Sequence, residues 1–250
     1  AYFEQVGSVT AQVRTSRHSS TPQIDTPHAR RRVSLADYEW ADLIDDADKV
    51  RMLIDPTSSY AKAAAAAMGR AMDDVIITAL GGTAYSGETG ATSVALPSTQ
   101  KFATSNQSDG LTIAKLLDAK KKMDIADVDP SLPRYVVCGA TQISDLLNTT
   151  EVKNSDFNTV KALAQGQVDS FLGFKFIMSN RLSFDASNTD DRLVFAFTKD
   201  AIKLAIGKDV TARIDERADK SYSTQVYYCM SIGATRIEEE KVVQIPCHEA

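Results

Sequence analysis

A single long helix constrains this chain more than any other feature of its sequence. Asp55-Pro56 predicts its start, because an Asp side chain accepts a hydrogen bond from a free backbone N–H and Pro is tolerated at the first helical position. Gly81-Gly82 predicts its end. Apolar residues recur at helical spacing between these signals: Tyr60, Ala64, Ala67, Met68, Ala71, Met72, Val75, Ile76 and Ala79. A helix over residues 56–80 is about 36 Å long, well over the usual length, and suits the backbone of a flat, extended subunit.

Residues 1–48 differ from the rest of the chain because they lack the apolar residues of a core. The alternation over Val9–Val13 predicts strands of an extended hairpin, with a polar tip beyond them. Charge is segregated within this segment. Residues 1–32 have a net charge of +3, from five arginines against Glu4 and Asp25. Residues 33–48 have six carboxylates and no Lys or Arg, a net charge of −6.

This segregation predicts contacts between identical subunits, in which the basic loop of one copy meets the acidic base of the next. The candidate interface residues are Arg14, Arg17, Arg30, Arg31, Arg32, Asp37, Trp40, Asp42, Asp45 and Asp46. Under this hypothesis, changing Arg30, Arg31 and Arg32 to Glu blocks assembly without unfolding the subunit. The alternative is a solvated, disordered tail in which the charges cluster by chance.

The bulk composition excludes several classes of protein. Hydrophobic residues make up 43% of the 250 residues, enough for a sizeable core, and the net charge of −5 argues against extensive wrapping of DNA. Cys138, Cys229 and Cys247 are odd in number and widely spaced, which argues against a disulfide framework and indicates a reducing compartment. No apolar run approaches the length of a membrane span, and the N-terminus lacks the apolar core of a signal peptide. These observations predict a soluble protein made in a cytoplasm.

The rest of the chain predicts short helices and strands in an irregular order. Helices are expected at residues 112–126, 141–147, 156–164 and 200–206. Strands are expected at residues 134–138, within 168–178, and at 193–197, 224–230 and 242–245. On the helix at 112–126, the residues expected to face inward are Ile113, Leu116, Leu117 and Met123. This irregular order favours an α+β fold with a mixed sheet over a regular βαβ array.

No motif in the sequence predicts a catalytic, metal or nucleotide site. Residues 82–89 have the glycine spacing of a phosphate-binding loop, but Glu88 stands where such a loop needs Lys. The three histidines have no further ligands at metal-binding spacing, and residues 238–240 are expected to form a solvated acidic face. Cys138 and Cys229 lie in apolar predicted strands, where a buried, inert thiol is the commoner state, although a Cys–His pair formed at a distance stays open. We therefore expect no enzyme activity, no metal and no cofactor.

Several short motifs occur in order along most of the chain. The motifs up to the end of the long helix are Asp37-Tyr-Glu-Trp40, Ile44-Asp-Asp-Ala-Asp48, Arg51-Met-Leu-Ile-Asp-Pro56, Met68-Gly-Arg70, Asp73-Asp74 and Leu80-Gly-Gly82. The later ones are Arg134-Tyr-Val-Val-Cys138, Leu172-Gly-Phe174, Ser179-Asn-Arg-Leu182, residues 195–204, Ser231-Ile-Gly-Ala234 and Glu240-Lys-Val-Val243. In order and spacing, these motifs resemble those of the major capsid proteins of tailed bacteriophages, podophage type, which share the Hong Kong 97-like fold.

The resemblance implies an α+β Hong Kong 97-like capsid fold with an extended E-loop, a long spine helix, and peripheral and axial domains. The implied boundaries are 1–48 for the E-loop, 49–132 and 223–250 for the peripheral domain with its spine helix at 56–80, and 133–222 for the axial domain. Some relatives cross-link covalently through a loop lysine. This chain has no Lys before Lys49, so we expect no such cross-link.

The implied function is that of a major capsid protein of the virion. Copies would assemble as hexamers and pentamers, in the cytoplasm of the bacterial host, into an icosahedral shell around phage double-stranded DNA. The implied partners are other copies of the chain, a scaffold, a portal and a decoration protein, with only weak, non-specific contact to DNA and none to a membrane.

Two other functions stay open at this point. An encapsulin-like nanocompartment shell shares the fold but encloses cargo enzymes, although the podophage-like segment Trp40–Pro56 favours a virus. A cytosolic enzyme with an unrecognised Cys or carboxylate site would be a compact, small oligomer. It would lose activity when Cys138 or Cys229 is changed.

Overall fold

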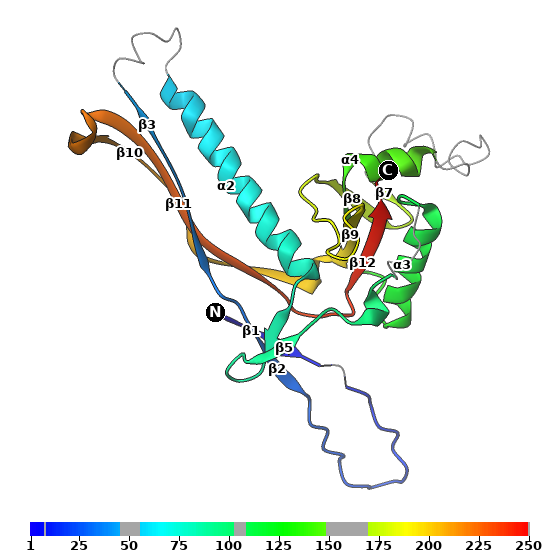
Figure 1. Ribbon diagram of the computed structural model, residues 1–250. Coiled ribbons are helices and arrows are strands. Elements are labelled where there is room, and N and C mark those ends of the chain that lie inside the picture. The colour runs from blue at the N-terminus through cyan, green and yellow to red at the C-terminus, as the bar shows by residue number, and fades with distance from the viewer. Residues whose placement is uncertain (8, 46–55, 103–108, 149–169, 250) are drawn as a thin grey trace.

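The structure, a computed structural model, describes residues 1–7, 9–45, 56–102, 109–148 and 170–249. Two limbs diverge from a common base, and a loop projects from that base on the opposite side (Figure 1). The first limb is α2 (Pro56–Gly81) packed on a three-stranded sheet of order β10-β11-β3. The second limb is built on a five-stranded sheet of order β12-β9-β6-β8-β7. The predicted α+β class with a mixed sheet is confirmed.

One apolar face of α2 holds the first limb together. Its sheet consists of β10 (Ile202–Arg217), β11 (Ser223–Arg236) and β3 (Ala36–Ile44), and both strand pairs are antiparallel. The apolar side chains that cluster between helix and sheet are Met68, Ala71, Met72 and Val75 with Tyr38, Trp40, Leu204, Tyr228, Met230 and Ile232. The helix ends where the Gly82 N–H donates to the Thr78 carbonyl at 2.9 Å. The predicted helix and its apolar face are therefore confirmed.

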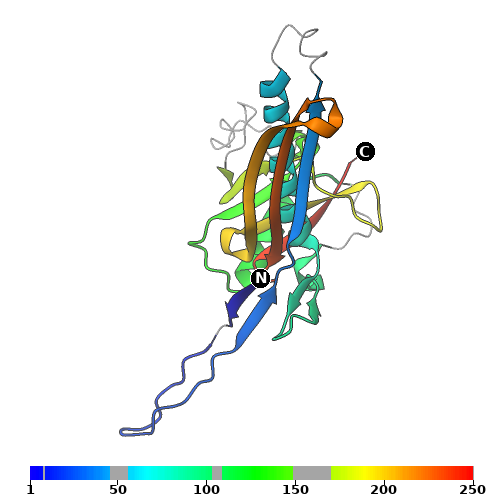
Figure 2. The same ribbon diagram turned by 90° about the vertical axis from the view of Figure 1, so that its left-hand side faces the viewer.

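The helix covers only one face of this sheet. Figure 2 shows β10, β11 and β3 side by side, with α2 behind them and no described element in front. Along β3 the odd-numbered residues from 37 to 43 are exposed, whereas the even-numbered residues from 38 to 42 are partly buried. Side chains alternate across a strand, so the exposed set faces away from α2. Among the described residues, this outer sheet face has no covering element.

The second limb contains the larger core. Its strands β6 (Arg134–Cys138) and β8 (Phe174–Met178) are parallel, while β9 (Asp191–Thr198) pairs antiparallel with both β6 and β12 (Val242–His248). A short β7 (Ser170–Phe171) completes the sheet, and α3 (Ile113–Ile125) and α4 (Ala140–Asn148) belong to the same limb (Figure 1). Side chains with no exposed area include Leu111, Leu116, Met123, Val136, Cys138, Leu146, Phe174, Val194, Val242, Ile245 and Cys247. The helices predicted at 112–126 and 141–147 and the strands at 134–138, 193–197 and 242–245 are confirmed.

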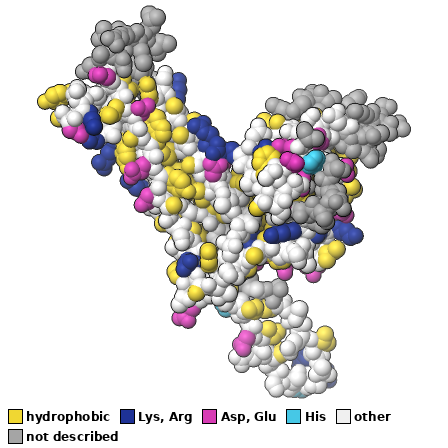
Figure 3. All heavy atoms as spheres, in the orientation of Figure 1, with side chains coloured by type: hydrophobic (Ala, Val, Ile, Leu, Met, Phe, Trp, Pro, Cys, Tyr) yellow, Lys and Arg dark blue, Asp and Glu magenta, His cyan; other side chains and the backbone are white. Residues whose placement is uncertain are grey.

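The two limbs are joined where α2 ends. Ile77 and Leu80, in its last turns, are buried in the core of the second limb. A Cβ on Gly81 would lie only 2.8 Å from the Phe195 ring, so glycine is required at this close approach. Above the junction the limbs are separated by the notch seen in Figure 3. An ion pair between Asp74 of α2 and Arg181, which follows β8, connects them again.

Some local predictions are wrong. Residues 202–206 begin the 16-residue strand β10, and only Lys199–Ala201 forms a helical turn, of the 3₁₀ type. Pairing along the whole of β11 outweighs the local preference there. Leu117 of α3 is 48% exposed rather than inward. The predicted hairpin is present, but residues 9–13 are not its strands. Its strands are β1 (Tyr2–Val6) and β2 (His28–Arg32), and residues 9–13 lie in the loop between them. The helix predicted at 156–164 lies outside the described residues.

The implied domain boundaries stay a prediction, and the strand pairing shows only which segments share a sheet. The implied peripheral domain includes residues 223–250, but β12 pairs with β9 in the second limb. The implied axial domain includes residues 133–222, but β10 pairs with β11 in the first limb. α3 also lies with the second limb, since Leu116 and Met123 are buried in its core. The chain crosses between the limbs more than once, and backbone pairing rather than sequence continuity decides where each strand belongs.

Candidate functional site

The projecting loop has almost nothing to pack against within its own subunit. β1 and β2 pair antiparallel, from Tyr2 opposite Arg32 to Val6 opposite His28, and the residues between them extend away from the base (Figure 1). Val13 is 89% exposed and Val9 51% exposed. Arg14 and Arg17 are exposed as well. Apolar side chains stabilise a protein when they leave water, and these side chains have no cover within their own subunit.

The root of the loop is fixed to the base by a small sheet. β2 pairs with β4 (Ala84–Ser86), and β4 pairs with β5 (Thr92–Val94). The Arg32 guanidinium lies 4.9 Å from the centroid of the Tyr85 ring, a cation–π contact that ties β2 to β4. Gly90, at a φ of +65°, approaches the Arg32 side chain so closely that a Cβ would lie 2.6 Å away. Arg32 is thus partly used within the subunit, whereas Arg30 is exposed.

The Arg31 side chain is held within its own subunit and is not exposed, so its predicted place at an interface stays a prediction without support from the structure. Its side chain is 4% exposed, and its Nη2 lies 2.8 Å from Glu239 Oε2. Its Nε donates to Gln5 Oε1 at 3.0 Å and to the Ile237 carbonyl at 3.1 Å. Alternation along β2 turns position 31 inward and position 30 outward. The triple change of Arg30, Arg31 and Arg32 to Glu would therefore bury a carboxylate beside Glu239 and destabilise the subunit.

Beneath the loop lies an ionic junction of Arg31, Arg236 and Glu239, which the sequence did not reveal. Arg236 is fully buried, and its guanidinium donates to the carbonyls of Leu80 at 2.9 Å and Gly82 at 2.8 Å. A cation at these carbonyls stabilises the end of α2. Burial lowers the pKa of Arg236, Glu239 raises it, and Arg31 lowers it. The Glu239 side chain is 15% exposed, so the expected solvated face is wrong at this position.

Arg236 makes two further contacts in this junction. Arg236 Nη2 also donates to the Val94 carbonyl at 3.1 Å, and its Nε lies 3.6 Å from Glu239 Oε1. One arginine therefore joins the end of α2, strand β5 and the carboxylate that holds β2. Nothing in the sequence marks Arg236 for this role, although the glycines that end α2 leave carbonyls that need donors.

The acidic residues of β3 lie on both faces of the sheet. Asp37 is exposed on the outer sheet face, and Asp45 is exposed just after the strand. Asp42 is partly buried on the α2 side, where its Oδ1 accepts a hydrogen bond from the Leu43 N–H at 2.8 Å. Trp40 packs in the apolar cluster under α2, so it is mainly a residue of the subunit's own core. Asp46 lies outside the described residues.

The structure does not bring the basic loop and the acidic strand together within one subunit. The loop and β3 extend from the base in opposite directions (Figure 1). No ion pair joins Arg14, Arg17 or Arg30 to a described carboxylate of the same chain. Their charge is therefore available to a neighbouring molecule.

The outer sheet face carries a thiol with an unusual environment. Lys208 Nζ of β10 donates to Cys229 Sγ of β11 at 2.9 Å, and Glu39 of β3 lies directly across from Cys229. The Lys208 ammonium lowers the pKa of the Cys229 thiol. Hydrogen bonding to Cys229, with burial and Glu39, raises the pKa of Tyr227 to about 12. Cys229 is 7% exposed, and its pKa is lowered rather than raised as in Cys138 and Cys247.

Cys229 is expected to react first when the folded subunit is treated with iodoacetamide near pH 8. Burial raises the pKa of both Cys138 and Cys247 to about 12, so almost no thiolate forms there at that pH. Changing Lys208 to Met should slow the reaction of Cys229 by roughly threefold to tenfold, because the pKa of its thiol rises when the ammonium is lost. Peptide mass spectrometry gives the rates, and denatured protein, with all three thiols accessible, is the control. Equal rates at the three cysteines in the folded subunit would contradict this reading.

The surroundings of the described histidines and cysteines show what chemistry these side chains can support. No group of three or more His, Cys, Asp or Glu side chains among them is placed to hold a metal ion. His248 Nδ1 lies 3.2 Å from Asp191 Oδ1, but the neighbouring Cys247 thiol is fully buried and contacts the Ile245 carbonyl at 3.8 Å. A buried thiol with a raised pKa is a poor nucleophile. No described helix combines the length and apolar character needed to cross a membrane.

Comparison with known proteins shows which fold has these features. A family model described as phage capsid protein matches residues 1–249. The structure of Mycobacterium phage Che8 is 20% identical, with a TM-score of 0.69 over 98% of this chain and 83% of that one. The capsid structure of cyanophage P-SCSP1u is 17% identical, with a TM-score of 0.71 over 100% of this chain and 84% of that one.

A third structure has a similar likeness to this chain. The acid-stable capsid of Helicobacter pylori bacteriophage KHP30 is 11% identical, with a TM-score of 0.68 over 99% of this chain and 84% of that one. No curated protein matches the chain. At these identities the structures establish the shared fold, and the family match over nearly every residue establishes membership. With a Hong Kong 97-like fold, the chain belongs to the phage capsid protein family and is a structural protein of the virion shell, not an enzyme.

Proposed function

We propose that this major capsid protein assembles as hexamers and pentamers, and that its projecting loop is buried by the next subunit. The proposal rests on two surfaces of the same chain that each lack a cover within the subunit. The loop exposes Val9 and Val13 with no cover of its own, and the outer sheet face has no described element in front of it. Because identical subunits repeat the same contacts around a ring, each copy can supply the cover that its neighbour lacks.

Charge supports the same contact. Arg14, Arg17 and Arg30 are exposed on the loop and at its root, and Asp37 and Asp45 are exposed on or beside β3. Complementary charges orient encounters and set register more than they add affinity, and exposed pairs contribute only about 0–1 kcal/mol each. Many copies in a closed shell multiply such modest contacts.

The proposal extends to the other molecules that a capsid meets. We infer assembly in the cytoplasm of the bacterial host, with a scaffold, a portal and a possible decoration protein as partners. Contact with the packaged double-stranded DNA would be weak and non-specific, because the chain carries a net charge of −5. On the one face that Figure 3 shows, basic and acidic side chains are interspersed.

Negative-stain electron microscopy with sedimentation velocity tests the proposal on the purified chain, expressed with and without its neighbouring genes. The expected result is closed shells tens of nanometres across, or rings of five and six subunits. DNA inside the shells would support the phage capsid role, whereas protein cargo would indicate a nanocompartment. A compact monomer or dimer under every condition would contradict assembly as hexamers and pentamers.

A further inference from the structure

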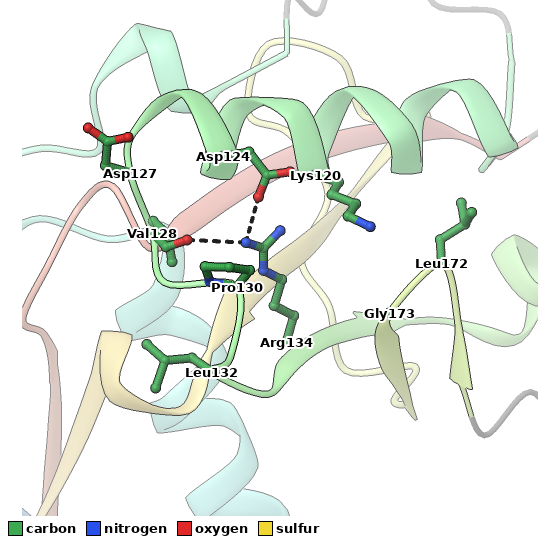
Figure 4. Close-up of a pocket in the computed structure, with 9 residues that line it drawn as sticks. All are labelled: Lys120, Asp124, Asp127, Val128, Pro130, Leu132, Arg134, Leu172 and Gly173. Carbon is green, nitrogen blue, oxygen red and sulfur yellow. Dashed lines mark hydrogen bonds and ion pairs between the residues drawn. The ribbon is translucent and has the colours of Figure 1, made fainter.

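A pocket in the second limb has the features of an anion site. It has a volume of about 470 Å³ and lies between the C-terminal half of α3, the segment that leads into β6, and the turn between β7 and β8 (Figure 4). Its charged lining residues are Lys120, Asp124, Asp127 and Arg134. The remaining walls are formed by Val128, Pro130, Leu132, Leu172 and Gly173.

Arg134 is the residue that points to a ligand. It is 5% exposed, and its Nη2 donates to Asp124 Oδ1 at 2.6 Å and to the Val128 carbonyl at 3.3 Å. Its Nε and Nη1 are buried and have no hydrogen-bond partner among the described residues. A guanidinium has five N–H donors, and buried donors in native proteins nearly always find an acceptor. Arg134 therefore lacks part of the acceptor set that its burial requires.

Lys120 supplies a second cation to the same pocket. It is partly buried and has no hydrogen-bond or ion-pair partner in the part of the chain that the structure describes. In Figure 4 the Arg134 guanidinium is turned toward Asp124 and Lys120, whereas the Asp127 carboxylate points away from them. Asp124 is paired with Arg134, so the Lys120 ammonium is the cation that remains unpaired among the described residues for an incoming anion.

The opposite wall is apolar and held in an uncommon backbone conformation. Leu172 and Gly173 form the tight turn between β7 and β8 with φ values of 54° and 86°. A leucine rarely adopts a positive φ, and the turn places it at the rim of the pocket beside the Lys120 side chain (Figure 4). Apolar walls reduce the access of water and strengthen electrostatic attraction to the two cations.

We propose that this pocket binds a phosphate group through Arg134 and Lys120. A phosphate carries up to two negative charges and enough acceptor oxygens to contact both cations at once. Arginine and lysine are the side chains that most often bind it. A carboxylate has a single charge and fewer acceptor sites, so it fits this pair of cations less well. The same group could arrive as free phosphate or as part of a nucleic-acid backbone, and both sources share this chemistry.

Isothermal titration of the purified full-length chain with sodium phosphate, at ionic strength held constant with sodium chloride, tests the proposal. Changing Lys120 to Met should weaken phosphate binding about tenfold or more. The matched control is Lys121→Met, because Lys121 is the next residue on α3, is exposed and does not line the pocket. It should leave the dissociation constant unchanged. Equal binding by the Lys120→Met variant and the unaltered chain would overturn the proposal.

A second variant changes the affinity in the opposite direction. Asp124→Asn removes the carboxylate that occupies Arg134 Nη2 and repels an anion, so phosphate should bind several-fold more tightly. Circular dichroism confirms that each variant is folded. If Asp124→Asn weakens binding in a folded chain, the charge argument fails.

Two more probes separate the sources of the phosphate group. Sodium acetate should bind at least tenfold more weakly than phosphate, and equally strong binding would overturn the assignment to phosphate. A ten-residue oligothymidylate whose binding depends on Lys120, with no binding of inorganic phosphate, would support a backbone phosphate as the ligand. Saturable binding of inorganic phosphate that depends on Lys120 supports free phosphate. Binding of no probe at millimolar concentrations would overturn the proposal.

Discussion

Replacing Glu239 with alanine should lower the free energy of unfolding of the subunit by about 3 kcal/mol. Glu239 is the carboxylate of the ionic junction, 2.8 Å from Arg31 and 3.6 Å from Arg236, and all three side chains are at least 85% buried. Removing it leaves two buried guanidinium groups facing each other without a counter-charge. Urea unfolding followed by circular dichroism measures the loss, and the melting temperature should fall by roughly 6–12 °C.

The neighbouring residue Glu238 provides a matched control. Its carboxylate lies 2.9 Å from Lys241 Nζ, but its side chain is 35% exposed, so water screens the pair. Glu238→Ala should therefore cost less than about 1 kcal/mol. If the two alanine variants unfold at the same urea concentration, the ionic junction does not stabilise the subunit. Glu239→Gln, which keeps the shape of the side chain, separates loss of charge from loss of packing.

Removing the projecting loop should abolish shell assembly while leaving the subunit folded. The change replaces residues 8–26 with a short turn containing Asn-Gly, since the Gly7 N–H already donates to the Pro27 carbonyl at 2.9 Å. No described residue of the loop belongs to either apolar core. The free energy of unfolding of the unassembled subunit should change by less than about 1 kcal/mol. Electron microscopy should show no closed shells.

Two smaller variants distinguish charge from apolar contact in the loop. The double change of Arg14 and Arg17 to Glu reverses the loop's charge without touching the ionic junction, and it should slow assembly or raise the concentration needed for it. The double change to Lys keeps the charge and is the control. Shells that form normally from the loop-deleted chain would contradict the proposal that a neighbour buries the loop.

The elements that were predicted correctly are those whose signal is local. α2 has a start signal, an apolar stripe and terminal glycines, and strands such as β6 and β12 are short apolar runs bounded by turns. β10 was missed because its first residues were interpreted as a short helix, although Ile202, Leu204 and Ile206 alternate as in a strand. Its pairing with β11 makes the whole segment a strand. Leu117 was misplaced because periodicity alone could not tell which of two adjacent leucines on α3 faces the core.

The candidate interface stays a prediction, and the structure shows only which of its residues are exposed in the single subunit. A basic loop beside an acidic strand could be read directly from the charges. Arg30, Arg31 and Arg32 look equivalent in the sequence, yet alternation on β2 leaves the first exposed and buries the second. Trp40 likewise packs toward α2 within its own subunit. The direction in which each residue of a strand faces depends on its register with its partner, and a charge pattern does not contain that register.

The sequence by itself determined the long helix, the fold class, the lack of a core in the first residues and, through its motifs, the family. The first three follow from composition and short-range periodicity, whereas the family follows from the resemblance of the ordered motifs. Only the tertiary structure decided that β10 and β12 belong to different limbs, that Arg236 closes the end of α2, and that Arg134 is left short of acceptors. Each of these depends on contacts between segments far apart in the chain, such as the 156 positions between Arg236 and Leu80. Burial and pairing across such separations arise only when the whole chain has folded.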